Sequence, residues 1–167
     1  VDDLLDVSRA DSGKLTLDLQ PFDFQELISD FAGVAEGVAS QKNQIVKITN
    51  FKEPIYLNGD RSRDLTPSNA SKYSPENSEI TVTTSHHSGH IEVEIADHGI
   101  GIAPHNLGSV FVPFFRAEDQ ETQKESGTGL GLSVVKTLIQ LHGGRVKIES
   151  TPGVGTTVKF WVPGVIE

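Results

Sequence analysis

Three glycines stand at alternate positions in the segment Gly127-Thr128-Gly129-Leu130-Gly131-Leu132, directly before a stretch of helical periodicity. Bare backbone N–H groups at a helix N-terminus attract anions, because the helix dipole points the same way. The spacing differs from the dinucleotide fingerprint, which needs a glycine at Leu132, and the chain has no phosphate-loop motif ending in Gly-Lys-Ser/Thr. The cluster predicts a phosphate site of another class, with an ordinary glycine-rich loop as the alternative.

A single carboxylate ends a predicted strand in the segment 97–102, which reads Asp-His-Gly-Ile-Gly-Ile. Asp97 has the parity of Ile91, Val93 and Ile95, so we expect it on the row of side chains that faces the core. A buried carboxylate needs a hydrogen-bond donor. The exocyclic amine of adenine would supply one, and the two glycines would let the backbone approach a flat ring. The alternative is that Asp97 caps the turn that follows it.

Asn69, Lys72 and Tyr73 are spaced so that they share one face of a short helix, which Pro75 would end. This face offers an oxygen ligand, a cation and an aromatic ring. An amide oxygen suits Mg²⁺, which is usually held by few protein ligands together with phosphates and water. The alternative is a solvated helix end.

The segment Phe111-Val112-Pro113-Phe114-Phe115-Arg116 precedes a long polar run over 117–126. Aromatic anchors beside such a run predict a hinged lid, with Arg116 able to reach a phosphate. A hydrophobic plug followed by a surface loop is the alternative.

The composition excludes several classes of protein. The chain has 167 residues, the size of one domain, and carries 14 Lys and Arg against 23 Asp and Glu, a net charge of −9. An acidic chain without a basic stripe is a poor ligand for nucleic acid or for an anionic membrane surface, and its apolar runs are too short to span a membrane. There is no cysteine, hence no thiolate nucleophile and no disulfide. Because it also lacks methionine, we expect a piece of a longer protein.

Helices and hairpins must position these clusters. A helical pattern ends at residue 11, and Asp23 with Glu26 indicates the start of an amphipathic helix that continues to about residue 41. Hairpins packed against a few amphipathic helices predict a two-layer α+β sandwich. The remaining predicted elements are strands at 45–49 and 54–58, a hairpin of 80–84 with 91–95, a helix over 130–142, and a hairpin of 146–148 with 158–162.

Three histidines lie where the first hairpin is predicted to turn, namely His86, His87 and His90. They could be read as metal ligands. Because no carboxylate stands at zinc-ligand spacing, we expect them to be solvent-exposed turn residues instead.

Taken in order, the four clusters resemble the N, G1, F and G2 boxes of sensor histidine kinases. The resemblance covers nearly the whole chain. Residues 1–20 look like the end of the second dimerisation helix and its linker, and residues 21–167 like the catalytic ATP-binding domain. The fold implied is the Bergerat (GHKL) fold, a mixed, mostly antiparallel sheet covered on one face by helices.

The resemblance also implies roles for individual residues. Asp97 would bind the adenine amine and Asn69 would bind Mg²⁺, while Lys72 and Arg116 would address the phosphates. Asn69, Lys72 and Arg116 are thus the implied catalytic residues, and residues 117–126 the ATP lid. The implied nucleotide contacts are Asn69, Lys72, Tyr73, Asp97, Gly99, Ile100, Gly101, Ile102, Phe111, Gly127, Thr128, Gly129, Leu130, Gly131, Leu132 and Thr156.

The function implied is transfer of the γ-phosphoryl group of Mg-ATP to a histidine in two-component signal transduction. Catalysis of this kind is mostly positioning and charge neutralisation, which agrees with the lack of a nucleophile here. The expected partners are ATP or ADP, the histidine-bearing dimerisation domain and the receiver domain of a response regulator. That histidine lies outside this chain, so we expect a monomeric, cytoplasmic fragment that acts only in trans and has no membrane contact of its own.

The chain departs from the family pattern before its N box. Residues 61–68, Arg-Ser-Arg-Asp-Leu-Thr-Pro-Ser, stand where the family has a Leu-rich helix about two turns longer with an earlier Asn. One alternative is therefore a degenerate GHKL module that has impaired nucleotide binding and serves in protein contacts. A GHKL ATPase is a second alternative, but such enzymes carry a Glu one turn before the Asn, where this chain has Leu65.

Overall fold

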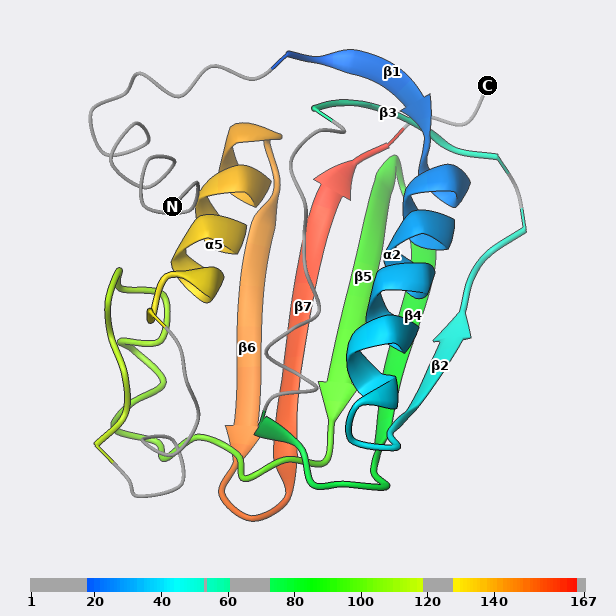
Figure 1. Cartoon of the computed structure of the whole chain (residues 1–167). Coiled ribbons are helices and arrows are strands. Elements are labelled where there is room, and N and C mark those ends of the chain that lie inside the picture. The colour runs from blue at the N-terminus through cyan, green and yellow to red at the C-terminus, as the bar shows by residue number, and fades with distance from the viewer. Residues whose placement is uncertain (1–17, 53, 61–72, 119–127, 165–167) are drawn as a thin grey trace.

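The computed structural model describes residues 18–52, 54–60, 73–118 and 128–164, which form two layers (Figure 1). One layer is a sheet and the other consists of helices, which confirms the predicted α+β class. The predicted end of a helix at residues 1–11 lies outside these ranges, as does the short helix predicted to carry Asn69, Lys72 and Tyr73, except for Tyr73 itself.

A mixed sheet of five strands forms one layer, in the order β2-β4-β5-β7-β6. Only β2 and β4 pair in parallel; the other neighbours are antiparallel. This agrees with the expected mixed, mostly antiparallel sheet. The strands are β2 (Ile45–Thr49), β4 (Glu79–His87), β5 (His90–Asp97), β6 (Arg145–Thr151) and β7 (Gly155–Pro163).

Two helices, α2 (Phe24–Ser40) and α5 (Gly131–Leu141), lie on the same face of this sheet (Figure 1). α2 packs against β2, and α5 packs against β6 and β7. A separate two-stranded sheet joins β1 (Gln20–Asp23) to β3 (Tyr56–Gly59) at one end of the molecule. The predicted strand at 54–58 thus begins and ends slightly later than expected.

The helix boundaries follow from local chemistry. Asp23 is the N-cap of α2, where its carboxylate accepts the backbone N–H of Gln25 at 2.9 Å, as its position before the apolar pattern predicted. At the C-terminal end of α5, Gly143 has a φ of +74°, the left-handed conformation that stops a helix.

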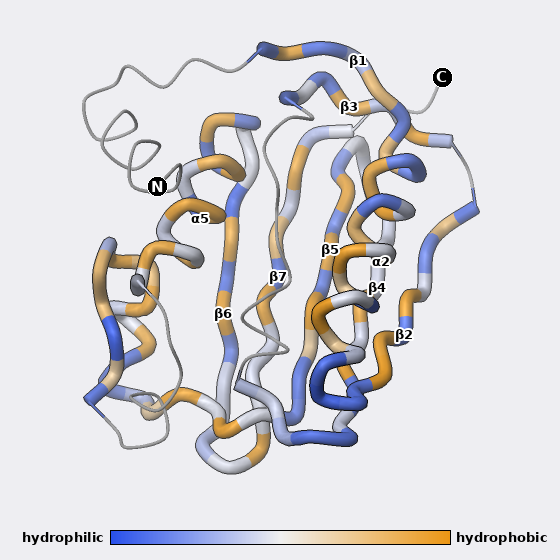
Figure 2. The backbone as a smooth tube through the Cα atoms, in the orientation of Figure 1, coloured by the Kyte–Doolittle hydropathy of each residue, from blue (hydrophilic) through white to orange (hydrophobic). Residues whose placement is uncertain are grey.

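The core lies between the sheet and the helices. Side chains alternate along each strand, and Figure 2 shows hydrophobic residues recurring along the strands and on α2 and α5. Every second residue of β4 and β5 enters the core, so that Val82 and Ile91 are fully buried. The ring of Phe24, at the start of α2, is buried and stacks on Phe51 with centroids 5.6 Å apart.

The turn between β4 and β5 is tighter than the sequence suggested. Ser88 and Gly89 both have positive φ, at 49° and 78°, as a two-residue type I′ turn requires, so the strands extend to His87 and His90. His86 therefore continues the core-facing row of β4, and its Nε2 atom is buried with no hydrogen-bond partner among the described residues. The expectation that all three histidines are exposed turn residues is wrong for His86, which is half-buried; His87 and His90 are exposed as expected, but they are strand residues that flank the turn.

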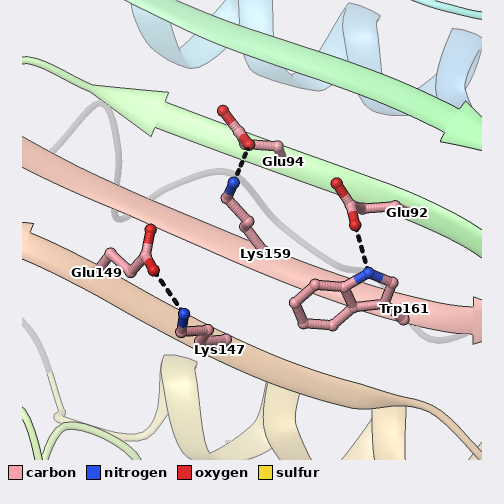
Figure 3. A network of polar contacts seen from close by, with 6 residues as sticks. All are labelled: Glu92, Glu94, Lys147, Glu149, Lys159 and Trp161. Carbon is pink, nitrogen blue, oxygen red and sulfur yellow. Dashed lines mark hydrogen bonds and ion pairs between the residues drawn. The ribbon is translucent and has the colours of Figure 1, made fainter.

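The opposite face of the sheet is polar. Glu94 pairs with Lys159 and Lys147 with Glu149, each at 2.6 Å, and the indole N–H of Trp161 donates to Glu92 (Figure 3). Such partly exposed pairs contribute little to stability. Their position on β5, β6 and β7 leaves the helix-covered face for the core and for the candidate site.

Within the described ranges, no helix is long and apolar enough to cross a membrane.

Replacing Ile91 by Ala tests where the core lies. The side chain is fully buried, so the loss of its contacts and the cavity left behind should lower the free energy of unfolding by about 2–5 kcal/mol. The matched control is Val154→Ala, at a residue that is 63% exposed, which should change it by less than about 0.5 kcal/mol. Equal effects of the two substitutions in chemical denaturation would contradict this assignment of the core.

Candidate nucleotide site

Asp97 stands at the end of β5, on the row that faces the helices. Its Oδ1 atom accepts two backbone hydrogen bonds, from Gly99 N at 2.8 Å and from Thr156 N at 3.1 Å. One carboxylate oxygen therefore ties the turn after β5 to the first residues of β7. The alternative function considered for Asp97, capping of the following turn, is performed by Oδ1 alone.

The other carboxylate oxygen, Oδ2, receives no hydrogen bond from any part of the chain that the structure describes. Burial raises the pKa of Asp97, and the two N–H donors and nearby His98 oppose this shift without cancelling it. Partial burial thus makes the charged form of this carboxylate costly. A ligand that donates a hydrogen bond to Oδ2 would offset this cost.

Gly99 is buried at a close approach of two segments. A Cβ atom built there would lie 2.3 Å from the carbonyl oxygen of Tyr73, the same carbonyl that accepts the N–H of Ile100 at 3.2 Å. Only glycine permits this contact. It places the backbone of Tyr73, and with it the end of the proposed N box, beside the segment 97–102.

The segment 97–102 is also joined to the hairpin between β6 and β7. Gly101 has a φ of +71°, and a Cβ atom there would lie 2.2 Å from the Thr151 carbonyl oxygen. The Ile100 carbonyl accepts the N–H of Gly153 at 2.8 Å, and Ile102 N donates to the Ser150 hydroxyl at 2.8 Å. Asp97, Tyr73, Thr156 and the residues between 99 and 102 are thus brought together.

A second group of contacts joins the proposed F and G2 boxes. Phe114 N donates to the Gly129 carbonyl at 3.0 Å, and a Cβ atom at Gly129 (φ +73°) would lie 2.7 Å from the Phe115 carbonyl oxygen. Phe114 itself has a φ of +64°, a strained conformation for a bulky residue, and its side chain is 59% exposed. The residues Phe114 and Phe115 before the polar run and Gly129 after it are therefore held against each other.

Helix α5 begins immediately after this contact. Leu130 is its N-cap, is buried, and supplies no side-chain cap. The first backbone N–H groups of a helix have no acceptor within the helix, so an uncapped start is suited to an anion. Thr128 and Gly131 are exposed here and Leu132 is half-buried. Figure 1 shows this start of α5 toward the same end of the sheet as the end of β5.

Phe111, the first residue of the proposed F box, lies beside α5. The ring of Phe111 is half-buried, with the ammonium group of Lys136 5.5 Å from its centroid. Arg116 is half-buried.

Several predicted site residues lie outside the described ranges: Asn69, Lys72, Gly127 and most of the run 117–126. Their roles, including metal binding by Asn69, stay predictions. Among the residues that are described, no group of three or more His, Asp or Glu could hold a metal ion.

Three positioning features escaped prediction from the sequence. The buried amide of Gln44 donates to the carbonyls of Ser74 and Pro75, at 3.1 and 3.0 Å, and fixes the segment after Tyr73. Ser150 binds Ile102 and the start of β7. At Gly155 a Cβ atom would lie 2.0 Å from the Asp97 carbonyl oxygen. The position of Gly155 directly before a Thr-rich strand was a sequence feature that could have indicated its role, whereas no sequence feature marked Gln44.

The arrangement combines an acceptor for an amine and an uncapped helix start for an anion, and the glycines at 99 and 101 admit the backbone of Tyr73 and Thr151 where the sequence had suggested room for a flat ring. The acceptor and the helix start are groups that an adenine nucleotide requires. The sequence is also similar to that of known proteins. Residues 67–166 match the family described as histidine kinase-, DNA gyrase B-, and HSP90-like ATPase. The chain belongs to this family.

Individual relatives point to its histidine kinase members. The chain is 31% identical to the sensor-like histidine kinase SenX3 of Mycolicibacterium smegmatis, over 98% of this chain and 44% of that protein. It is 35% identical to the histidine protein kinase DivJ of Caulobacter vibrioides, over 98% of this chain and 28% of that protein. The chain thus spans less than half the length of these relatives.

Solved structures agree. The mycobacterial sensor histidine kinase MprB matches with a TM-score of 0.75 and 28% identity, over 89% of this chain and 99% of that one. Full-length ShkA in complex with AMPPNP matches with a TM-score of 0.82 and 25% identity, over 99% of this chain and 35% of that one. The predicted Bergerat fold and the resemblance to histidine kinase catalytic domains are confirmed.

Alanine substitutions at two glycines with similar positive φ angles distinguish the effect of backbone strain from the effect of a close contact. Gly101→Ala should destabilise the fold and weaken nucleotide binding about tenfold or more, because its Cβ would collide with the Thr151 backbone. Gly153→Ala should cost only about 1–2 kcal/mol of stability, because Gly153 has a φ of +73° but nothing within 4 Å of its Cβ position. Calorimetry and thermal melts compare the two; equal loss of binding would contradict the assigned contact.

Replacing Asp97 by Asn separates stability from ligand binding. The raised folded-state pKa means that the folded protein holds the proton to higher pH than the unfolded chain does. Stability therefore falls as pH rises from 3.8 through the folded pKa, and at neutral pH the buried charge is a cost. Asn keeps the Oδ1 acceptor without that charge, so thermal melts at pH 7 should show the variant at least as stable as wild type.

The control for this experiment is Asp97→Ala, which leaves the N–H groups of Gly99 and Thr156 without their acceptor. It should lower the free energy of unfolding by about 1–3 kcal/mol. A clear loss of stability in Asp97→Asn at pH 7 would show that the buried charge is not a cost.

Proposed function

We propose that this chain is the part of a sensor histidine kinase that binds Mg-ATP and passes its γ-phosphoryl group to a histidine on a dimerisation domain, for two-component signal transduction. In this proposal residues 21–167 form the catalytic ATP-binding domain and residues 1–20 the end of the second dimerisation helix with its linker. The observation that carries it is the half-buried Asp97 carboxylate, with Oδ1 fixed by two backbone donors and Oδ2 unused within the described part of the chain.

Adenine supplies what this carboxylate lacks. Its 6-amino group would donate to Oδ2, while the ring would lie beside the segment 97–102, which the close contacts of Gly99 with Tyr73 and of Gly101 with Thr151 hold in place. Because the bound amine favours the ionised carboxylate and burial favours the protonated one, affinity should fall as pH drops toward the raised pKa.

The phosphates would lie toward the start of α5. Uncapped N–H groups there, beside Gly129 and Gly131, favour a negative charge, and Gly127 belongs to the same predicted phosphate site. Lys72 and Arg116 would add positive charge, and the amide oxygen of Asn69 would coordinate Mg²⁺ between protein and phosphates. With no nucleophile of its own, the domain would act by positioning and by neutralising charge on the transferred group.

The partners follow from this role. The acceptor histidine belongs to a domain outside residues 1–167, so the isolated chain should act in trans on a separate histidine-bearing domain, and the phosphoryl group would pass on to a receiver domain. Isolated from most of its dimerisation helices, the chain should be a monomer. Its need for ATP would place such a domain on the cytoplasmic side of the cell.

The short segment before the N box supports a second candidate, a module that keeps the fold without binding nucleotide. Residues 61–68 leave less chain than the family pattern for one wall of the site. The two candidates differ in one measurable property, the affinity for nucleotide.

Calorimetric titration of ADP with Mg²⁺ distinguishes them. Wild type should bind in the micromolar to sub-millimolar range, about −5 to −8 kcal/mol. Asp97→Asn should lose about tenfold or more, because it can no longer pair an anionic acceptor with the amine. Asn69→Ala should still bind ADP but lose the dependence on Mg²⁺.

Phosphotransfer from radiolabelled ATP to a separate histidine-bearing domain then tests the kinase activity itself. Steady release of phosphate without labelling of that domain would favour an ATPase. A folded wild type that shows no heat and no thermal shift at millimolar nucleotide would favour the module without nucleotide.

A further inference from the structure

Three polar residues lie side by side where the apolar rows of the sheet end. On the helix-covered face, neighbouring strands bring Ile95, Val158 and Ile148 into one row. The next row on this face, two residues away on each strand, consists of Asp97 on β5, Thr156 on β7 and Ser150 on β6. Ser150 and Thr156 are direct partners in the β6–β7 ladder, and Thr156 N donates to Asp97.

The hydroxyl of Ser150 has three partners. Ile102 N donates to it at 2.8 Å, the Gly155 carbonyl lies 2.8 Å away, and the Thr156 hydroxyl lies 2.9 Å away. A hydroxyl has one hydrogen to donate and two lone pairs to accept with, so these contacts use its whole capacity.

The direction of every hydrogen in this group is then determined. A carbonyl only accepts, so the single hydrogen of Ser150 goes to Gly155 O. One lone pair of Ser150 receives the N–H of Ile102, and the remaining lone pair can only receive the hydrogen of Thr156. The Thr156 oxygen is then left as an acceptor toward any other group.

We infer that Ser150 is a positioning residue that sets the purine preference of this site by holding the Thr156 hydroxyl as an acceptor. This rests on the proposed function. With Thr156 fixed in this way, Asp97 Oδ2 and Thr156 Oγ1 are acceptors on adjacent strands of one row, each able to take a further donor. A 6-amino purine has two amine hydrogens at position 6, whereas a 6-oxo purine has a carbonyl at that position and only the single N1–H donor beside it. The 6-oxo purine can therefore satisfy at most one of the two acceptors and sets its carbonyl oxygen against the other.

Without the Ser150 hydroxyl, Thr156 is free to rotate and to donate its hydrogen to a 6-oxo group. Ser150→Ala should therefore weaken binding of ADP roughly three- to tenfold, the usual effect of one hydrogen bond, and leave binding of inosine diphosphate unchanged or improved. The ratio of the two affinities is the readout, because a merely structural defect would weaken both nucleotides alike.

The experiment is calorimetry with ADP and with inosine diphosphate, in Mg²⁺, on the whole chain. Wild type should prefer ADP, Ser150→Ala should lose most of that preference, and Ser150→Thr should keep it because it keeps the hydroxyl. Ser150→Cys fills the space with a poor hydrogen-bonding group and gives the same expected loss if the Ala variant does not fold. Thr156→Val should also lose the preference, and the double variant Ser150→Ala with Thr156→Val should show the same ratio as Thr156→Val alone.

Each other outcome overturns the inference. If Ser150→Ala weakens both nucleotides equally, or if the double variant loses preference beyond Thr156→Val, Ser150 does not act through Thr156, and the proposed function stands. If wild type binds both nucleotides equally, the site has no such preference. If folded wild type binds neither, the proposed function fails together with the inference.

Discussion

The rest of the site depends on one carboxylate oxygen that accepts two backbone N–H groups. Oδ1 of Asp97 holds Gly99 and Thr156, and so joins the turn after β5 to the start of β7. Close contacts then fix the neighbouring segments: Gly99 against Tyr73, Gly101 against Thr151 and Gly155 against Asp97 itself. A side chain at any of these three glycines would push the segments apart, so the geometry around Asp97 is highly constrained.

This constraint has an energetic consequence. Two N–H donors reduce the cost of burying the carboxylate, but its burial still raises the pKa of Asp97. The site is thus arranged for a donor that is supplied from outside. Ser150 contributes in a similar way, because it fixes the hydroxyl oxygen of Thr156 as a second acceptor in addition to Asp97 Oδ2.

Much of the fold and of the candidate site could be predicted from the sequence, and the exceptions have physical reasons. The alternation Ile91, Val93, Ile95 placed Asp97 on the core-facing row, and the same period predicted the hairpins. The prediction for His86 was wrong because a two-residue turn with two positive φ angles lengthens both strands, and Ser88 is not a residue typical of such a turn.

Long-range contacts could not be predicted from the sequence for a different reason. Ser150 meets Ile102 across 48 residues, and Gln44 meets Ser74 across 30, so nothing in their local sequence marks them as parts of the site. The glycines at 99, 101 and 129 were visible as a pattern, but which backbone each of them admits is a property of the fold.

The most direct test of the central claim is a crystal structure of this chain with ADP and Mg²⁺. We predict the adenine amine within about 3 Å of Asp97 Oδ2, while Oδ1 keeps its bonds to Gly99 and Thr156. Adenine bound elsewhere, or an Asp97 carboxylate turned away from the base, would contradict this role of Asp97.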